Sequence, residues 1–551
     1  MNQQGLDRET IQTDVLVLGG GIAGFRAAIA ARETGAEVVL AHKGHGASPY
    51  VIGFNSPIGS ADERDGPDVF AEDMVRGGYG LNERPLVRIL AEESIDAFRE
   101  LSVLGVPFAQ SGGRIAQRHL SGNTYPRSLY IAEGTGSALM KALKKRAREL
   151  GVSIFGGLRA IDLLRDNDAV AGALLWKPHT ATLTSIRAGA TVLAMGGIGR
   201  LFADSTYPAD VAADALGFAL DAGAALIDME FVQFEPVVTI WPEQCRGMEM
   251  PTAMLGDGAQ LRNAIGERFM LRVNPPHGEK HIEKAKMALH IQREIDEGRG
   301  LFPGGVIFDT TTVPREKLES YISHCSRLRG AGLEPTTRSP IVAPGAHSVM
   351  GGVAIDERGS TGVPGLYAGG ESAAGVHGAS RIAGNGCSDT LVFGALAGRS
   401  AARCIRPSYC GRWSGMEGAV EQKLLSSGQF PIDEARRLKD EIRDTVAKAA
   451  GIWRSAVSLE EGLVGIGKIR QELLDARSDS LPSAVELMEA RRMTDVAATV
   501  IGSALLRTES RGAHQRTDFP ATDELNWLVH NEYRKEADGR LASRTIEVTK
   551  E

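Results

Sequence analysis

Three glycines near the start of the chain have the spacing of a phosphate-binding turn. Gly19, Gly21 and Gly24 follow a short apolar run and precede an alanine-rich segment. The first glycine permits a tight turn, the second lets a pyrophosphate approach the backbone, and the third lets a helix pack against the strand. The helix N-terminus then offers unpaired N–H groups to the phosphates. A purely structural turn is the alternative, but the strand–turn–helix context favours a bound dinucleotide.

Two further stretches favour FAD over NAD. The second strand of the unit ends in Ala41-His42-Lys43, where an NAD site usually places an acid for the adenosine ribose. The stretch 191–197, which reads TVLAMGG, is similar to a strand of flavoproteins with two dinucleotide domains. Taken alone, this stretch could also be one more buried strand with a glycine turn. Together, the two observations predict FAD.

The pattern of apolar residues predicts an α/β protein. Strand 14–18, helix 23–34 and strand 37–40 form a βαβ unit of about 30 residues. Further elements are predicted by the same reasoning: helix 137–150, strand 190–194, strand 365–368, helix 391–404, and helices within 433–476. Residues 234–340 are less regular, with one helix near 281–297, and are expected to form an inserted domain. The last 40 or so residues are polar and are expected to run over the surface.

Composition limits the possible partners. The 551 residues are 43% hydrophobic and 24% charged, with a net charge of −7 and no basic tract, so no nucleic-acid partner is expected. The five cysteines are dispersed without a Cys-x-x-Cys pair, which argues against a metal or iron–sulfur site in this chain. We find no signal-peptide pattern and no apolar run of about 18 residues. A cytoplasmic location is predicted, peripheral to a membrane only through a partner.

Four longer stretches carry a specific resemblance. They are residues 192–236, 344–356 (PGAHSVMGGVAID), 365–398 and 509–520 (ESRGAHQRTDFP). With the N-terminal turn, they are similar in the same order to the succinate dehydrogenase/fumarate reductase flavoprotein family, which includes the aspartate oxidases. The resemblance implies a Rossmann-like FAD-binding domain interrupted by an α+β capping domain and followed by a helical domain. The boundaries expected are 1–233 and 341–406 for the FAD domain, 234–340 for the cap, 407–508 for the helical domain and 509–551 for a C-terminal tail.

The resemblance also implies a set of FAD contacts. They are Gly19, Gly21, Gly24, Lys43, Ser48, Gly196, Gly197, Asp214, Glu371, Asn385, Gly386 and Cys387. The turn 385–387 precedes a helix whose N-terminal dipole would face the N1–O2 edge of the flavin. The family usually has Ser-Leu in place of Gly386-Cys387, so one hydroxyl contact is lost. We interpret Cys387 as a small apolar filler, with a reactive thiol as the alternative.

The family's covalent flavin link uses a histidine that has no counterpart here. Pro49 occupies the matching position in Ser48-Pro49-Tyr50, and His45 lies four residues too early. The FAD is therefore predicted to be held non-covalently.

The catalytic set that the resemblance implies is only partly present. His347 and Arg381 match a substrate-binding histidine and arginine of the family, and a guanidinium suits a carboxylate. His377, close to Arg381, is expected to be structural. Glu235 stands where the family has another substrate histidine. Thr252-Ala253 is the nearest match to a Thr-Glu pair that contacts the substrate in the family.

The family's proton-shuttle arginine is not recognisable. Aligned on the stretch 294–300, Leu289 takes its position, and a shift of one turn would instead bring Lys286 or Arg293 there. A carboxylate at Glu235 would repel one end of a dicarboxylate by several kcal/mol at about 4 Å and an effective dielectric constant of about 20. Negligible fumarate turnover is therefore expected. Glu235 could accept a proton or hydrogen-bond an amine or hydroxyl, or it could form a structural salt bridge.

These observations predict an FAD-dependent dehydrogenase or reductase. It would move a hydride between flavin N5 and a small anionic substrate held by Arg381 and His347, with Glu235 nearby, and would not be a typical succinate or fumarate enzyme. The electron partner would be a separate iron–sulfur or ferredoxin-like subunit. An aspartate-oxidase-like enzyme that uses oxygen is one alternative. A non-catalytic FAD-bearing electron-transfer or scaffold subunit is another.

Overall fold

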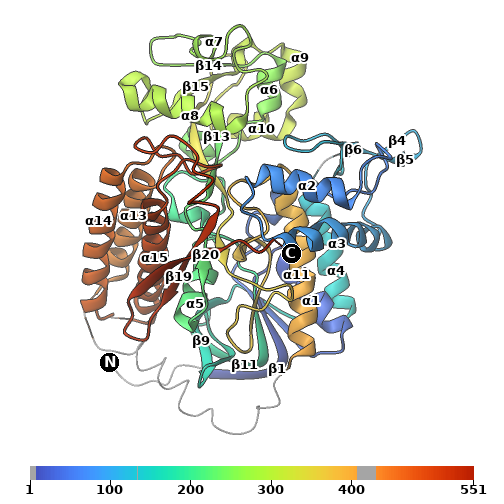
Figure 1. Cartoon of the computed structure of the whole chain (residues 1–551), viewed down its shortest axis with the longest axis vertical. Coiled ribbons are helices and arrows are strands. Elements are labelled where there is room, and N and C mark those ends of the chain that lie inside the picture. The colour runs from blue at the N-terminus through green and yellow to red at the C-terminus, as the bar shows by residue number, and fades with distance from the viewer. Residues whose placement is uncertain (1–7, 133, 406–427, 429, 479, 551) are drawn as a thin grey trace.

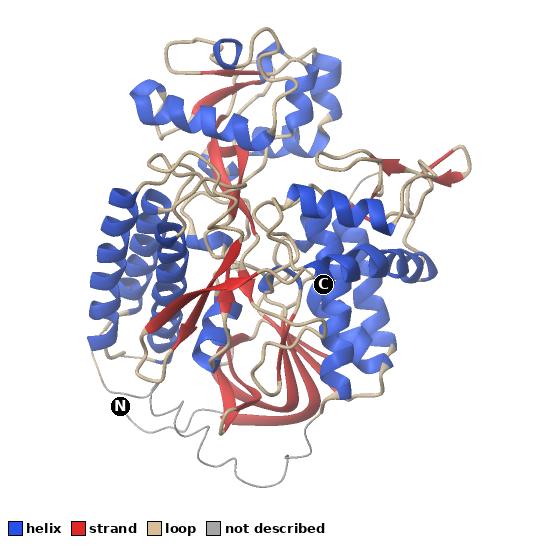
Figure 2. Cartoon of the chain, in the orientation of Figure 1, coloured by secondary structure: helices blue, strands red, loops and turns tan. Residues whose placement is uncertain are grey.

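A large α/β body carries a smaller domain at one end of the molecule, drawn at the top of Figure 1. The computed structural model describes residues 8–132, 134–405, 428, 430–478 and 480–550. The body contains the main sheet, with helices on both sides of it, and the C-terminal helices stand as a group beside it (Figures 1 and 2).

The central sheet of the body has seven strands in the order β8-β2-β1-β11-β10-β9, with β18 paired to β11. Its strands are β1 (Arg8–Leu18), β2 (Val38–His42), β8 (Ser153–Gly156), β9 (Arg159–Asp166), β10 (Ala169–Lys177), β11 (Thr182–Leu193) and β18 (Leu366–Ala368). Strands β1, β2, β8, β11 and β18 are parallel, whereas β9, β10 and β11 are antiparallel neighbours. The predicted βαβ unit is confirmed, because β1 pairs in parallel with β2 across helix α1 (Ile22–Glu33).

The apolar run of β1 is explained by burial of both faces of the sheet. Val15 and Val17 pack in one core with helices α1, α4 (Thr135–Glu149) and α11 (Asn385–Arg403). Leu16 and Leu18 pack in the opposite core, with α5 (Asp214–Ala222) and the C-terminal helices. A parallel strand covered on both faces reads as a continuous hydrophobic segment rather than an alternating one.

The inserted domain, called the cap below, has its own sheet in the order β13-β16-β15-β14. Its elements are β13 (Val232–Trp241), α6 (Thr252–Asp257), β14 (Gln260–Arg262), α7 (Met270–Val273), α8 (Lys284–Glu294), β15 (Val306–Asp309), α9 (Arg315–Ser320), α10 (Ile322–Gly330) and β16 (Ile341–Val349). A separate hydrophobic core fills it. The antiparallel strands β13 and β16 run from the body into the cap, so residues near their body ends lie between the two parts (Figure 1).

Helices α13 (Ile432–Ala449), α14 (Ala456–Asp475) and α15 (Leu481–Leu506) pack against one another. The helices predicted within 433–476 are therefore confirmed as α13 and α14. The remaining elements are β3 (Phe54–Asn55), α2 (Pro67–Gly77), α3 (Arg84–Val103), β4 (Gln110–Ser111), β5 (Arg114–Ile115), β6 (Gln117–Arg118), β7 (Ser128–Leu129), β12 (Leu226–Ile227), β17 (Gly352–Val353), β19 (Val529–Lys535) and β20 (Leu541–Glu547). The first residues of the expected 407–508 domain lie outside the described ranges.

The expectation that the last 40 or so residues run over the surface is wrong for much of this segment. Strand β19 enters a sheet ordered β17-β12-β19-β20. Glu509, Arg511 and Arg516 are almost fully buried. Burial of these charges is possible because they are paired: the Nε of Arg511 lies 2.7 Å from Glu509, and Arg516 Nη2 lies 2.8 Å from Asp518. Polarity alone did not reveal these pairs.

None of the helices in the described parts of the chain is both long and apolar enough to cross a membrane.

Candidate active site at the junction of body and cap

The glycine turn between β1 and α1 has the close packing that the motif requires. A Cβ on Gly19 would lie 2.0 Å from the carbonyl oxygen of Ala194, and a Cβ on Gly24 would lie 2.0 Å from the carbonyl oxygen of Gly19. Gly19 also has φ of 128°, which favours glycine. Helix α1 has no side-chain hydrogen bond from its N-cap, Gly21. The Ile22 N–H donates to the Ser48 hydroxyl at 2.9 Å. Ser48 therefore lies at the helix end where a phosphate would bind.

The other residues expected at FAD are gathered around this turn and the end of β11. Lys43 and Asp214 form an ion pair between the ends of β2 and α5. Gly196 has φ of 80°, and a Cβ on Gly197 would lie 2.5 Å from a Val349 methyl group. Glu371 accepts hydrogen bonds from the Tyr207 hydroxyl and, at 3.2 Å, from the Val349 N–H. Burial raises the pKa of Glu371 to about 7.

The N-terminus of α11 is a second helix end without a side-chain cap. Its N-cap, Gly384, has φ of 94° and makes no side-chain cap. The Asn385 carbonyl oxygen Oδ1 accepts from Asn55 Nδ2 at 2.6 Å, which holds the first residue of the helix. Cys387 lies in an apolar core, and burial raises the pKa of its thiol to about 12. A thiol with so high a pKa stays protonated near pH 7, which favours the interpretation of Cys387 as a small apolar residue that fills space over that of a reactive thiol. The glycine cradle, the two uncapped helix ends and the polar residues between them fit FAD.

The body ends of β13 and β16 bring Glu235 and His347 together. The ligand-type atoms of Glu235, His347 and a third residue, Glu249, all lie within 4.8 Å of one another. The Nδ1 of His347 lies 3.0 Å from the Thr206 hydroxyl. Burial, and then the charge of Arg381, lower the pKa of His347 to about 4, so its imidazole is neutral near pH 7.

Arg381 is held in one orientation by neighbours on the same strands. Its Nε donates to the Ser348 hydroxyl at 3.1 Å, and its Nη2 donates to Gln233 Oε1 at 3.2 Å. A third N–H, on Nη1, donates to the Ile382 carbonyl at 3.2 Å. A guanidinium fixed in this way is preorganised for a planar, charged ligand. By contrast, His377 is buried and lies 3.5 Å from Asp389, in agreement with a structural role.

The residue missed by sequence reasoning is Lys284, in the first turn of α8. Its ammonium nitrogen lies 2.8 and 2.9 Å from the two carboxylate oxygens of Glu235, and 3.3 Å from Glu249. The alignment on residues 294–300 places Leu289 at the proton-shuttle position, whereas the α8 side chain that contacts Glu235 is Lys284. Which residue of this helix donates a proton stays a prediction. The two alternative residues make other contacts: Lys286 pairs with Glu283 at the surface, and the Arg293 guanidinium stacks on Trp453.

The electrostatic state of Glu235 follows from this arrangement. Its side chain is 3% exposed. Burial, and then the neighbouring Glu249 carboxylate, raise the pKa of Glu235 to about 7, although Lys284 opposes the rise. Glu235 can therefore exchange a proton near neutral pH. The carboxylate is also less repulsive than the sequence suggested, because a cation lies directly against it.

Comparisons with known proteins agree with this geometry. The family described as "FAD binding domain" matches residues 14–387, and the family described as "Fumarate reductase flavoprotein C-term" matches residues 439–551. A component of the fumarate reductase (CoM/CoB) of Methanothermobacter marburgensis is 35% identical over 94% of this chain and 96% of its own length. The L-aspartate oxidase of Caulobacter vibrioides is 33% identical over 93% and 94%.

Two solved structures are also similar to this chain over nearly its whole length. Sdh1 of Mycobacterium smegmatis, in complex with UQ1, matches with a TM-score of 0.88 at 30% identity and covers 98% of this chain and 94% of its own. FrdA of Escherichia coli quinol fumarate reductase matches with a TM-score of 0.88 at 26% identity, covering 98% and 97%.

Proposed function

Because the chain belongs to the succinate dehydrogenase/fumarate reductase flavoprotein family of FAD-dependent oxidoreductases, we propose that it transfers a hydride between flavin N5 and a small carboxylate. The single observation that supports this most directly is the convergence of Arg381, His347 and the Lys284–Glu235 pair at the junction of body and cap. This convergence joins an anion receptor to a proton-exchanging pair, and reduction of a carbon–carbon double bond needs both.

Non-covalent FAD is part of this proposal. Ser48, Lys43 and the α1 N-terminus would hold the pyrophosphate end, and the α11 N-terminus would face the flavin. Pro49 lies in a short 3-10 turn and has no group that could form a link. His45 is engaged at both ring nitrogens, 2.8 Å from the Gly20 carbonyl and 2.8 Å from Lys144 Nζ. When bound, FAD supplies two-electron chemistry at N5.

The chain's own residues account for the remaining steps. Arg381 would bind one carboxylate of the substrate through its guanidinium, and the neutral His347 would hydrogen-bond the same ligand. In the reductive direction, one substrate carbon receives a hydride and the adjacent carbon receives a proton. The Lys284 ammonium can give that proton and regain one from Glu235, whose pKa near 7 suits exchange with solvent. Dehydrogenation would use the same groups in reverse.

Anaerobic mixing with candidate acids tests this function. Bleaching of the oxidised flavin by a carboxylate would support a dehydrogenase, and reoxidation of reduced enzyme by an unsaturated acid would support a reductase. No spectral response to any small acid or amine would instead favour a non-catalytic electron-transfer or scaffold subunit.

An amino-acid oxidase is the second candidate, since one relative is named L-aspartate oxidase and is 33% identical over 93% of this chain. Fast reoxidation by air after bleaching with an amino acid would support this candidate. Slow reoxidation by air would support a separate electron partner. We propose an iron–sulfur or ferredoxin-like subunit, in line with relatives that are named as subunits.

A further inference from the structure

Glu249 lies beside Glu235 because the chain doubles back after strand β13. Residues 247–250 return along this strand, and Glu249 pairs with Val238 in an isolated antiparallel bridge. One carboxylate oxygen of each acid and one ring nitrogen of His347 lie within 4.8 Å of one another. Two acids therefore meet at a place where the sequence pattern indicated only one.

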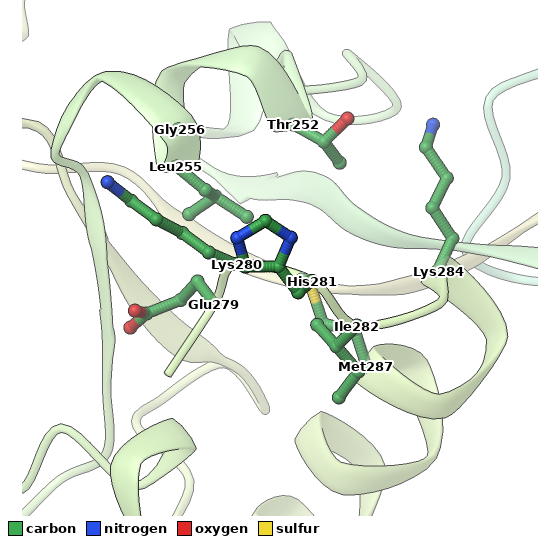
Figure 3. Close-up of a pocket in the computed structure, with 9 residues that line it drawn as sticks. All are labelled: Thr252, Leu255, Gly256, Glu279, Lys280, His281, Ile282, Lys284 and Met287. Atoms are coloured by element: carbon green, nitrogen blue, oxygen red, sulfur yellow. The ribbon is translucent and has the colours of Figure 1, made fainter. Parts of the chain in front are cut away.

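The ammonium group of Lys284 is shared between the two acids. Its nitrogen lies 2.8 and 2.9 Å from the oxygens of Glu235 and 3.3 Å from Glu249. These hydrogen bonds use all three N–H donors that a lysine ammonium has. Lys284 also borders a pocket of the cap, and Figure 3 shows that its side chain stands apart from the other labelled side chains. A proton that leaves Lys284 can therefore be replaced from a carboxyl group in contact with it.

The two acids differ in their access to solvent. The side chain of Glu235 is 3% exposed, whereas that of Glu249 is 39% exposed. Glu235 therefore has almost no surface from which to take up a proton from water. Glu249 contacts Lys284 and reaches solvent as well.

The two acids also differ in protonation. Burial, and then the charge of Glu249, raise the pKa of Glu235 to about 7. Burial opposes the charge of Glu249 too, but the Lys284 ammonium and hydrogen bonds from Lys284 and Glu235 lower the pKa of Glu249. Near pH 7 the exchangeable proton therefore resides on Glu235, and Glu249 is a carboxylate. The titratable and charged groups that face the two acids are Lys284 from α8, His347 from β16, His324 from α10, and Arg381.

We propose that Glu249 is the entrance of a proton path that leads from solvent through Glu235 to Lys284. This inference rests on the proposed function and adds the group through which the buried Glu235 exchanges protons with water. In the reductive direction, Lys284 loses one proton to the substrate carbon adjacent to the one that receives the hydride. Glu235 then gives its proton to Lys284, and a proton that Glu249 takes from water restores Glu235. One proton thus enters from solvent for each hydride transferred, and dehydrogenation uses the same path outward.

Replacement of Glu249 by glutamine in the FAD-loaded protein tests this path. Glutamine keeps the size of the side chain but carries no exchangeable acid proton. Reduction of the flavin by succinate or butyrate, and its reoxidation by fumarate or crotonate, are followed by stopped flow, and the fastest reaction of the wild type is used. We expect Glu249→Gln to react about 10–100-fold more slowly, less than the 10²–10⁴-fold usual for a group that transfers the proton directly.

Two readouts separate proton delivery from a structural role. Imidazole is a diffusible acid that titrates near neutral pH and does not compete with carboxylates for Arg381. It should accelerate Glu249→Gln in proportion to its concentration and leave the wild type unchanged. The solvent deuterium isotope effect on the flavin reaction should be larger in Glu249→Gln than in the wild type. Glu249→Asp, which keeps a carboxyl group, should retain most of the wild-type rate.

The matched control is Glu243→Gln, since Glu243 is an exposed acid of the same cap segment that pairs with Arg246 instead. This variant should react like the wild type. FAD content checks folding, and Glu249→Ala, which leaves room for imidazole, is the second variant.

The possible outcomes are distinct. A slow reaction that imidazole restores supports the path. An unchanged rate in Glu249→Gln would mean that Lys284 takes its proton directly from water, which overturns the path and leaves the proposed function standing. A slow reaction of the glutamine and alanine variants that imidazole does not restore would show a structural role and also overturn the path. If none of the four acids changes the flavin spectrum of the wild type, both the path and the proposed function are overturned.

Discussion

The ammonium nitrogen of Lys284 lies 2.8 and 2.9 Å from the two carboxylate oxygens of Glu235, and this pair links the start of helix α8 to strand β13. Lys284 belongs to helix α8 of the cap, whereas Glu235 belongs to strand β13, which connects the two parts. A buried carboxylate at this place is tolerated because a cation contacts it. Burial opposes the charge of Lys284, but the Glu235 and Glu249 carboxylates raise its pKa, so the ammonium is charged near pH 7, whereas the pKa of Glu235, about 7, allows proton exchange there.

Replacement of Lys284 by methionine should slow the chemical step. Methionine keeps an unbranched side chain but cannot donate a proton, so turnover should fall about 10²–10⁴-fold, the usual contribution of general acid–base catalysis. Stopped-flow flavin oxidation or reduction measures this, with FAD content as a check on folding. Lys286→Met, on the exposed face of the same helix, is the control and should react normally. Unchanged rates in the Lys284 variant would exclude it from proton transfer.

Replacement of Arg381 by lysine should weaken substrate capture. Lysine keeps the charge but loses the planar fork that Ser348 and Gln233 hold in place. We expect kcat/KM to fall roughly 10–150-fold, which corresponds to a loss of about 1.5–3 kcal/mol in transition-state stabilisation. FAD content should change little. Arg293→Lys, which lies over Trp453, is the control. Unaltered kinetics would remove Arg381 from the substrate site.

Neutralising Glu235 should strengthen the binding of a dicarboxylate. Glu235, Glu249 and Lys284 together carry one net negative charge when both acids are ionised. Glu235→Gln removes it, and at an effective dielectric constant of about 20 a unit charge at about 4 Å contributes several kcal/mol. The Kd of succinate, measured from the flavin spectrum, should fall at least about tenfold. Glu243→Gln, an exposed acid, is the control. Weaker succinate binding in Glu235→Gln would contradict the electrostatic argument for this site.

The FAD should leave the protein on acid precipitation. Pro49 offers no nucleophile, and both nitrogens of His45 are hydrogen-bonded. All the yellow colour is therefore expected in the supernatant. Flavin that remains with the washed pellet would show a covalent link and contradict the proposal.

The fold should lose stability at alkaline pH through His530. Burial opposes its charge, but the carboxylates of Asp228 and Glu83 on either side raise the pKa of His530 to about 10. Because this pKa lies above the unfolded value of about 6.5, the stabilisation is complete below pH ~6.5 and is lost as the pH rises through about 10.

Urea unfolding of the wild type and of His530→Gln measures this effect. The difference in free energy of unfolding should be on the order of a few kcal/mol at pH 6 and should shrink at pH 10.5. His179→Gln, an exposed histidine, should show no such trend. A difference that stays constant with pH would mean that His530 is not charged in the folded protein.

Local motifs were predictable from the sequence because their physical requirements are local. The turn from Gly19 to Gly24 needs only a strand, three small residues and a helix, and the structure places all of them within one βαβ unit. The absence of a tethering group at Pro49 and the presence of an acid at Glu235 are likewise statements about single positions.

The position of α8 could not be predicted with the same accuracy. Lys280 precedes the helix, and Lys284, Lys286 and Arg293 lie along it, so a small shift in the alignment changes which cation is assigned to the site. The same limit applied to the C-terminal segment, where charged residues are buried because they pair with one another.

The sequence by itself determined the cofactor class, the βαβ unit and the identity of the residues at 235, 347 and 381. Only the tertiary structure decided which cation meets Glu235, because the two partners are 49 residues apart and come from different elements. Whether the side chain of Lys284 points into the site depends on where α8 begins and how it packs on the cap core. Both are set by contacts between distant segments, which no local pattern records.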